Sequence, residues 1–295
     1  PLYRRLIRAI REVDPNHVIL LEGVHWATDF SVFEDFTPKE AADNIVLEFH
    51  KYWSDPDEES LAPFVETAKR LNVPLWMGEG GENNLQWYTY AFPMYERLGI
   101  GWCFWAYKKM EVPNSPVTFE KPEGWDQITA YLDGRERPAP EAAQAIFDRF
   151  LNCISHGEYH PEIIRALTRR PPLEIPAGAY DAEDIQSRRS AGAVFRRTSK
   201  AALLFADGHT GEADWRRYGG EAQPEDQKIL LCLREGDRIG YRVENLEEKK
   251  LRIDVHSYGD GTLNVQNMTA QQGLVWVSCN SGIIIVESLH ITIEE

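Results

Sequence analysis

The chain has 295 residues, of which 43% are hydrophobic and 11% aromatic, so it can bury one large core or two ordinary ones and does not have the composition of a disordered chain. Its formal charge of −15 argues against a general nucleic-acid binder, which needs a clustered basic surface. No stretch reaches the ~18 to 20 continuous apolar residues of a membrane span. We therefore expect neither a nucleic acid nor a membrane as a partner.

Helix and strand patterns alternate through the first half of the chain. Apolar residues at helical spacing predict a helix over residues 1–13, which "DPNH" ends. Four continuous apolar runs then have the pattern of strands buried on both faces: "VILLEG" from residue 18, "NIVLEFHKY" at 44–52, "VPLWMGEGG" at 73–81 and "GIGWCFWAY" at 99–107. Further helices are predicted at about 60–71, at 82–98 and at 140–154.

The predicted strands begin about 30 residues apart, which is the length of a βαβ unit and favours a parallel sheet. Four such units are half of an eight-stranded barrel, which typically needs about 250 residues. An open doubly wound sheet is the alternative. It is disfavoured because the first βα turn lacks G-x-G-x-x-G and no later turn has the pattern of a phosphate-binding loop.

The character of the sequence changes at residues 156–178, where the prolines of "RRPPLEIPAG" interrupt the helical patterning and predict a linker. Beyond it, eight short strand patterns alternate with Gly, Asp and Asn turns, which is typical of an antiparallel β-sandwich. The predicted fold class is therefore α/β plus all-β. Residues 1–155 form the carboxyl-terminal half of a (β/α)8 TIM barrel, and residues 179–295 form a sandwich accessory domain.

Polar side chains end each of the four apolar runs: Glu22, then His50 with Tyr52, then Glu79, then Trp105. Active sites of parallel barrels lie at the carboxyl ends of the strands, so this recurrence predicts a site. His50 and Tyr52 are two residues apart and point to the same side of an extended strand, and a tyrosine hydroxyl keeps a neighbouring carboxylate ionised by donating to it. An isolated strand-end glutamate is as often a structural acceptor. The convergence favours a catalytic Glu79, with Trp105 stacking on a sugar ring.

The segments "AIREVDPNHVILLEG", "NIVLEFHKY", "MGEGG" and "GWCFWAYK", in this order, resemble strands five to eight of a glycoside hydrolase family 5 barrel, a family of cellulase-like retaining enzymes. The resemblance covers about residues 1–155 and implies that Glu79 is the nucleophile, with His50 and Tyr52 beside it. It implies substrate contacts from Trp105, Trp26 and Lys108. A β-linked glucan or related glycan as partner, no cofactor for catalysis, and a secreted or periplasmic location are implied as well.

The chain departs from the family pattern in one respect. The acid/base glutamate of the family follows an asparagine at the end of strand four, and Asn-Glu-Pro occurs nowhere in this sequence. Retaining hydrolysis needs two carboxyl groups about 5 to 5.5 Å apart. Glu22 ends the strand that matches strand five, which has no acid/base role in the family, so we interpret it as a wall residue.

We therefore expect the chain alone to be inactive, with the missing amino-terminal barrel half supplied by another segment or chain. The alternative hypothesis is a noncatalytic carbohydrate-binding protein built on an incomplete barrel. A structural domain whose polar strand ends only satisfy hydrogen bonds is a third interpretation.

In the second half, "IPAGAYDAEDI" and "EGDRIGYRVENLEEKKLRIDVHSYGDGTLNV" resemble carbohydrate-binding modules of families 6 and 35. In such modules acids of the opening strand help to hold a structural calcium, and the resemblance implies this role for Asp181 and Glu183, which alternate on one strand face. A solvated pair of charges is the equal alternative. Trp215 and Tyr218 in "ADWRRYGG" are candidate sugar platforms.

The cysteines lack C-x-x-C spacing, which argues against a zinc site or a redox pair; they are Cys103, Cys153, Cys232 and Cys279. We expect buried free thiols. A bond between Cys232 and Cys279 stays open, because spacing alone cannot establish one.

Overall fold

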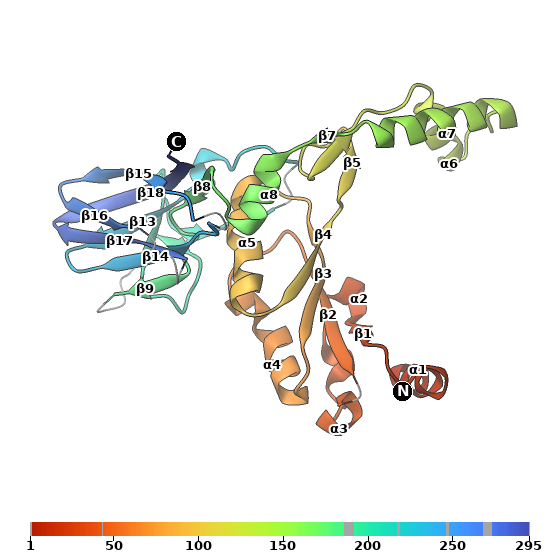
Figure 1. Cartoon of the computed structure of the whole chain (residues 1–295), viewed down its shortest axis with the longest axis horizontal. Coiled ribbons are helices and arrows are strands. Elements are labelled where there is room, and N and C mark those ends of the chain that lie inside the picture. The colour runs from red at the N-terminus through yellow and green to blue at the C-terminus, as the bar shows by residue number, and fades with distance from the viewer. Residues whose placement is uncertain are drawn as a thin grey trace.

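The computed structural model describes residues 2–42, 44–185, 192–216, 219–245, 248–267 and 273–294. Figure 1 shows three parts: a parallel sheet with its helices in the centre, a projection that carries two helices, and antiparallel sheets on the far side of helix α5 (Leu85–Arg97).

The central part repeats helix and strand. Its sheet has the order β1, β2, β3, β4, and all neighbours are parallel: β1 (Ile19–Glu22), β2 (Ile45–Lys51), β3 (Leu75–Gly81) and β4 (Gly101–Trp105). Each strand begins within two residues of its predicted start, so the predicted parallel sheet is confirmed. The helices are α1 (Leu2–Val13), α2 (Val24–Ala27), α3 (Pro38–Ala41), α4 (Ala62–Leu71) and α5, with short 3₁₀ turns η1 (Ser31–Phe33) and η2 (Glu59–Leu61).

One face of this sheet is packed under helices. The Phe49 ring of β2 stacks on Phe64 of α4, with 4.6 Å between ring centroids, and meets Tyr95 of α5 edge-on at 6.2 Å. Between these buried positions, Glu48 and His50 are only partly buried. Successive strand residues point to opposite faces, so the helices cover the apolar set and leave the polar set on the other face.

The sheet is open at both sides, with β1 and β4 as its edges in the described part of the chain. Apolar side chains near the β1 edge are exposed, for example Leu20 at 45% and Val18 at 50%. The prediction that both faces of the strands are buried is therefore wrong for this structure. A parallel sheet is covered on its second face only when further elements pack there or the sheet closes into a barrel.

A projection follows β4. Its short sheet consists of β5 (Lys108–Met110), β6 (Val117–Phe119) and β7 (Glu158–Tyr159), and it carries α6 (Trp125–Leu132) and α7 (Pro140–Ser155) (Figure 1). Trp125 stacks on Phe150 at 4.8 Å between centroids, which joins the two helices. The predicted helix at 140–154 is confirmed as α7, whereas α6 and the short sheet were not predicted. No described helix is long and apolar enough to cross a membrane.

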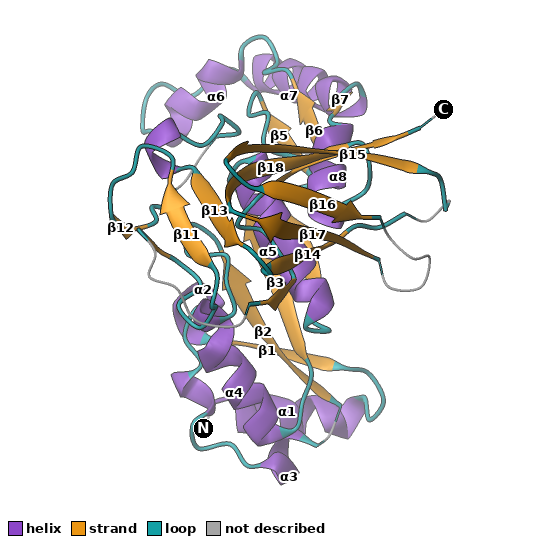
Figure 2. Cartoon of the chain, turned by 90° about the vertical axis from the view of Figure 1, so that its left-hand side faces the viewer, coloured by secondary structure: helices purple, strands orange, loops and turns teal. Residues whose placement is uncertain are grey.

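Residues 156–178, predicted as a linker, are structured instead. They form α8 (Pro161–Thr168) and β8 (Leu173–Pro176), and β8 pairs with β18 of the antiparallel region. Figure 2 shows α8 beside α5. Pro161 occupies the first turn of α8, where its missing N–H has no helical partner to lose, so this proline begins a helix and does not break one. The buried face of α8 carries Ile163 and Leu167.

The antiparallel region has two main sheets. The first has the order β11 (Ala202–Phe205), β13 (Ile229–Arg234), β18 (Ile283–Ile293), β15 (Leu251–Gly259), with β8 also on β18. The second has the order β16 (Thr262–Gln266), β17 (Leu274–Ser281), β14 (Arg238–Arg242), β9 (Ala182–Asp184). A short parallel pair, β10 (Ala193–Val194) with β12 (Gly211–Glu212), and the turn η3 (Glu225–Gln227) complete it. All eight predicted strand patterns form strands.

Aromatic packing joins this region to α5. Tyr90 of α5 meets Trp215 edge-on at 5.1 Å and Phe195 at 5.6 Å between centroids. Trp215 is only 4% exposed, so the prediction that it offers a sugar platform is wrong: its ring packs against Tyr90 and Phe195. Tyr218, the other predicted platform, lies outside the described residues.

The four cysteines are free thiols, so Cys232 and Cys279 are not bonded. Burial is mixed, because Cys279 is buried while Cys103 is exposed. The prediction of free thiols is confirmed, and the prediction that they are buried is wrong for Cys103.

Candidate active site

Glu79 lies near the carboxyl end of β3, where a bulge sets its side chain opposite β2. Phe49 pairs with Met77, but the next residue, His50, pairs with Glu79, so Gly78 is an extra residue on β3. In an unbroken register His50 would face Gly78. Bulges of this kind re-aim a side chain beside active sites, and here the bulge brings Glu79 to His50.

Two side chains of the β2 segment meet the Glu79 carboxylate. The Tyr52 hydroxyl donates to Glu79 Oε2 at 2.9 Å, and His50 Nδ1 lies 3.5 Å from the same oxygen. The Glu79 side chain is 33% exposed, whereas the His50 side chain is 10% exposed, so the carboxylate is open to solvent and the ring beside it is enclosed. Burial, and then the hydrogen bond to Glu79, raise the pKa of Tyr52 above its usual range, so the phenol keeps its proton and remains a donor.

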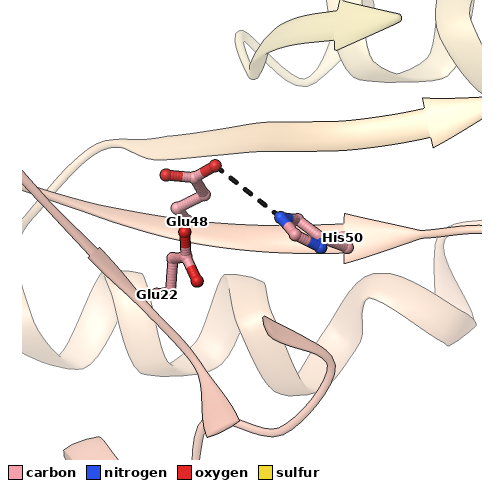
Figure 3. Close-up of side chains that lie close together, drawn as sticks. All are labelled: Glu22, Glu48 and His50. Carbon is pink, nitrogen blue, oxygen red and sulfur yellow. Dashed lines mark ion pairs between the residues drawn. The ribbon is translucent and has the colours of Figure 1, made fainter. Parts of the chain in front are cut away.

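Three side chains, Glu22, Glu48 and His50, converge on one face of the sheet (Figure 3). Glu22 of β1 is the register partner of Glu48 on β2, and oxygens of both lie within 4.8 Å of a ring nitrogen of His50. Burial, and then the charge of Glu22, raise the pKa of the Glu48 carboxyl. Among the described residues this is the one cluster with the spacing of a metal site. Burial and repulsion from the Glu22 charge both favour the neutral form of the Glu48 carboxyl, so we assign no ion to this cluster.

Trp105 ends β4 opposite Gly81, the last residue of β3, and its side chain is exposed, as a sugar platform requires. A Cβ at Gly81 would lie 2.2 Å from the Trp105 carbonyl oxygen, and Gly81 has a positive φ of 147°, so a residue without a side chain is needed where these two strand ends approach. Trp26, in α2 after β1, is the more exposed of the two tryptophans at 86%.

Lys108 does not have the position predicted for a substrate ligand. Its Nζ donates to the carbonyl oxygen of Ile154 at 2.7 Å, near the end of α7. A cation at the carboxyl end of a helix is favoured by the helix dipole and fills one of its free carbonyls. The Lys108 ammonium therefore ties β5 to α7.

The predicted calcium ligands are bound by other protein groups. The Asp181 carboxylate pairs with the Arg169 guanidinium and accepts the backbone N–H of Arg242 at 2.7 Å. Glu183 accepts from the Ser199 hydroxyl at 2.5 Å and from the Lys200 N–H at 3.0 Å. A guanidinium against Asp181 repels a second cation, so these two carboxylates do not fit a calcium site as they are arranged here.

Sequence reasoning missed Glu48 and Lys51, although the alternation in "LEFHKY" that exposes His50 also exposes Glu48. Lys51 falls on the opposite, helix-covered face, and burial lowers the pKa of its ammonium to about 8. Its Nζ donates to Ser54 Oγ at 2.9 Å, and Ser54 Oγ donates to the Tyr52 carbonyl at 2.7 Å. Lys51 therefore orders the loop that carries Tyr52.

Residues 1–111 match the family model described as "Cellulase (glycosyl hydrolase family 5)". Residues 1–111, called here the family 5 segment, are thus similar to glycosyl hydrolase family 5. No curated protein matches the chain.

Three solved structures show what the chain is similar to. An endoglucanase of Pseudomonas stutzeri is 22% identical over 35% of this chain and 40% of its own, with a TM-score of 0.32. The catalytic domain of a Thermobifida fusca endoglucanase is 25% identical. The match covers 35% of this chain and 38% of that domain, with a TM-score of 0.28. The catalytic domain of a mannanase from Streptomyces sp. SirexAA-E is 19% identical. The match covers 39% of this chain and 40% of that domain, with a TM-score of 0.30. The chain thus covers 38% to 40% of the length of these three proteins.

The family 5 segment contains β1 to β4 and both side chains that meet Glu79, His50 and Tyr52. The antiparallel sheets lie beyond residue 111, outside the family 5 match. The resemblance of those sheets to carbohydrate-binding modules stays a prediction.

Proposed function

We propose that this chain forms the part of a retaining β-glycosidase that carries the nucleophile, Glu79, and that its substrate is a β-linked glucan or a related glycan. The observation that carries the proposal is the Glu79 carboxylate itself: it is partly exposed at the carboxyl end of a parallel strand, held by the Tyr52 hydroxyl at 2.9 Å, within a family 5 segment. In barrels this end of the sheet carries the chemistry.

In the proposed reaction Glu79 attacks the anomeric carbon of the sugar. The glycosidic bond breaks, the leaving oxygen takes a proton from a second carboxylic acid, and water then hydrolyses the glycosyl–Glu79 ester with overall retention of configuration. Tyr52 and His50 orient the attacking oxygen. The ionised carboxylate is the nucleophilic form, and the Tyr52 hydroxyl donates a hydrogen bond to its Oε2.

The second carboxylic acid is proposed to come from polypeptide outside this chain, since Asn-Glu-Pro is absent from the sequence. The open sheet supports this proposal. Its edge strands β1 and β4 would each gain a partner if four further βα units closed a barrel. In the same proposal the antiparallel sheets form a β-sandwich accessory domain over residues 179–295. Secretion or a periplasmic location stays a prediction.

A probe with a very good leaving group separates the nucleophile from the missing acid. We would use a dinitrophenyl β-cellobioside that carries fluorine at carbon two, called here the fluoro-cellobioside. Dinitrophenolate leaves without protonation, and the fluorine slows hydrolysis of the glycosyl ester so that it accumulates. We expect the mass of the chain to rise by one fluoro-cellobiosyl group on the peptide that contains Glu79, and no label on Glu79→Gln.

The same experiment is run on the chain mixed with the first four βα units of a family 5 endoglucanase. Label on Glu79 in either sample supports the proposal. Label on another carboxylate would remove Glu79 as the nucleophile. Reversible binding of cellobiose without label in both samples would favour the noncatalytic carbohydrate-binding alternative.

A further inference from the structure

We infer that Glu48 is a positioning residue that holds Glu79 in place, through the bulge at Gly78 and through the ring of His50. The inference deepens the proposed function and rests on it for its catalytic meaning. Glu48 lies on the open face of β2, two residues before His50, and its side chain is 16% exposed. It is thus more enclosed than the Glu79 carboxylate, which is 33% exposed.

The first route runs through the backbone of β3. An ideal Cβ built on Gly78 would lie 1.6 Å from Glu48 Oε1 and 2.5 Å from its Cδ, so the Glu48 carboxyl group occupies the space of the side chain that Gly78 lacks. Gly78 is also the extra residue of the bulge that sets Glu79 opposite His50. The Glu48 carboxyl therefore packs against the backbone whose irregular path aims Glu79.

The second route runs through His50. Its ring lies between two carboxylates, with Nε2 3.8 Å from Glu48 Oε1 and Nδ1 3.5 Å from Glu79 Oε2. Glu48 and Glu79 lie nearest to different nitrogens of the ring, so Glu48 limits rotation of the imidazole. A side chain that packs against an active-site group in this way fixes the geometry of that group without touching the substrate.

The two routes predict different effects for different substitutions. Glu48→Gln keeps the shape of the side chain at Gly78 and against His50, so the Tyr52–Glu79 hydrogen bond should survive. Glu48→Ala removes the side-chain contacts with Gly78 and with His50, so the bulge and the imidazole ring can both move. Gly78→Ala forces the Glu48 carboxyl out of its place and should reproduce the effect of Glu48→Ala. Val46→Ala, on the same face of β2 but away from Gly78, controls for lost bulk.

The test uses the whole chain and two readouts. Crystal structures of the variants give the distance from Tyr52 Oη to Glu79 Oε2, which needs no activity. The fluoro-cellobioside gives the rate of Glu79 labelling at saturation and the inhibition constant separately. We expect Glu48→Ala and Gly78→Ala to lose the 2.9 Å contact and to label about 10- to 100-fold more slowly with an unchanged inhibition constant, because misplacement of about 1 Å has effects of this size.

Glu48→Gln and Val46→Ala should keep the contact and label within about threefold of the unmodified chain, since neither empties the space at Gly78. The double variant Glu48→Ala/Gly78→Ala should be no worse than either single variant, because the alanine at position 48 leaves room for the new Cβ; such non-additivity identifies contacting residues. Additive losses, or a retained 2.9 Å contact in Glu48→Ala, would overturn the inference. If the unmodified chain is labelled neither alone nor with the first four βα units of a family 5 endoglucanase, but Glu79 moves in Glu48→Ala, the positioning role stands and only the proposed function fails.

Discussion

The guanidinium of Arg169 and the carboxylate of Asp181 form a buried ion pair between the end of α8 and the start of β9, with side chains 3% and 5% exposed. Arg169 Nη2 also donates to the carbonyl of Thr89 in α5 at 2.9 Å. One side chain thus contacts α5, which follows the strand of Glu79, and the antiparallel region. The region beyond residue 178 is therefore held against the central part by a buried ion pair and a buried hydrogen bond as well as by aromatic packing.

Arg169→Met should lower the free energy of unfolding by about 3 to 5 kcal/mol, because it leaves the buried Asp181 carboxylate with only the more distant Arg97, whose Nε lies 3.8 Å from Asp181 Oδ1. Urea denaturation followed by circular dichroism measures the loss. The matched control is Arg170→Met, whose partner Glu244 and own side chain are 40% and 44% exposed. That variant should lose less than about 1 kcal/mol. Equal losses would mean that the buried pair contributes no more than a surface pair.

Lys51 predicts a specific dependence of stability on pH. The pKa of its ammonium is about 8 in the folded chain, against 10.5 for an unperturbed lysine, chiefly because of burial. Between these values the unfolded chain binds more protons than the folded one, so stability rises with pH across the window. Below pH 8 the buried charge opposes folding by about 3 kcal/mol, and this opposition disappears by about pH 10.5.

The measurement compares the unmodified chain with Lys51→Met at pH 7 and at pH 10.5. The difference in unfolding free energy should move by about 3 kcal/mol in favour of the unmodified chain at the higher pH. Tyrosines that ionise in this range are common to both chains, so they cancel in the difference. Parallel pH profiles would contradict a lowered pKa at Lys51.

The parts of the fold that the sequence predicts are those governed by local pattern. Apolar runs spaced by helices predict β1 to β4, because a parallel strand and its crossover helix leave this periodicity in any chain. The alternation of β2 likewise predicts that His50 and Tyr52 share a face, whereas the pairing of His50 with Glu79 depends on the bulge at Gly78. What could not be predicted depends on contacts between distant segments.

Gly78 illustrates the limit. In "MGEGG" it has the pattern of a turn glycine, and only the pairing of β3 with β2 shows that it is a bulge filled by Glu48. Arg169 has the sequence context of a solvated linker charge among prolines. Its burial follows from the packing of α8 on α5 and β8 and from its ion pair with Asp181, which no local pattern encodes.

Tyr52→Phe should slow the labelling of Glu79 by the fluoro-cellobioside about 10- to 100-fold, since a hydrogen bond to a charged group contributes about 1.5 to 3 kcal/mol. The ring and its packing remain, so the change removes only the donor to Glu79 Oε2. Tyr131→Phe, on the exposed surface of α6, serves as the control and should not alter the rate. A normal rate in Tyr52→Phe would mean that the hydroxyl does not assist the attack.

Trp105→Ala should weaken binding of the fluoro-cellobioside about 10-fold, or ~1.4 kcal/mol, because an aromatic face stacked on a sugar ring is lost. Stacking on a sugar away from the reacting bond is the same before and during the reaction, so the labelling rate at saturation should change little. Trp105→Phe should restore most of the affinity. Trp26→Ala is the comparison variant, because the two tryptophans lie at opposite edges of the sheet. Trp26 follows β1 and is 86% exposed, whereas Trp105 ends β4 and is 49% exposed. Weaker binding in Trp26→Ala alone would move the sugar subsite from the β4 edge to the β1 edge.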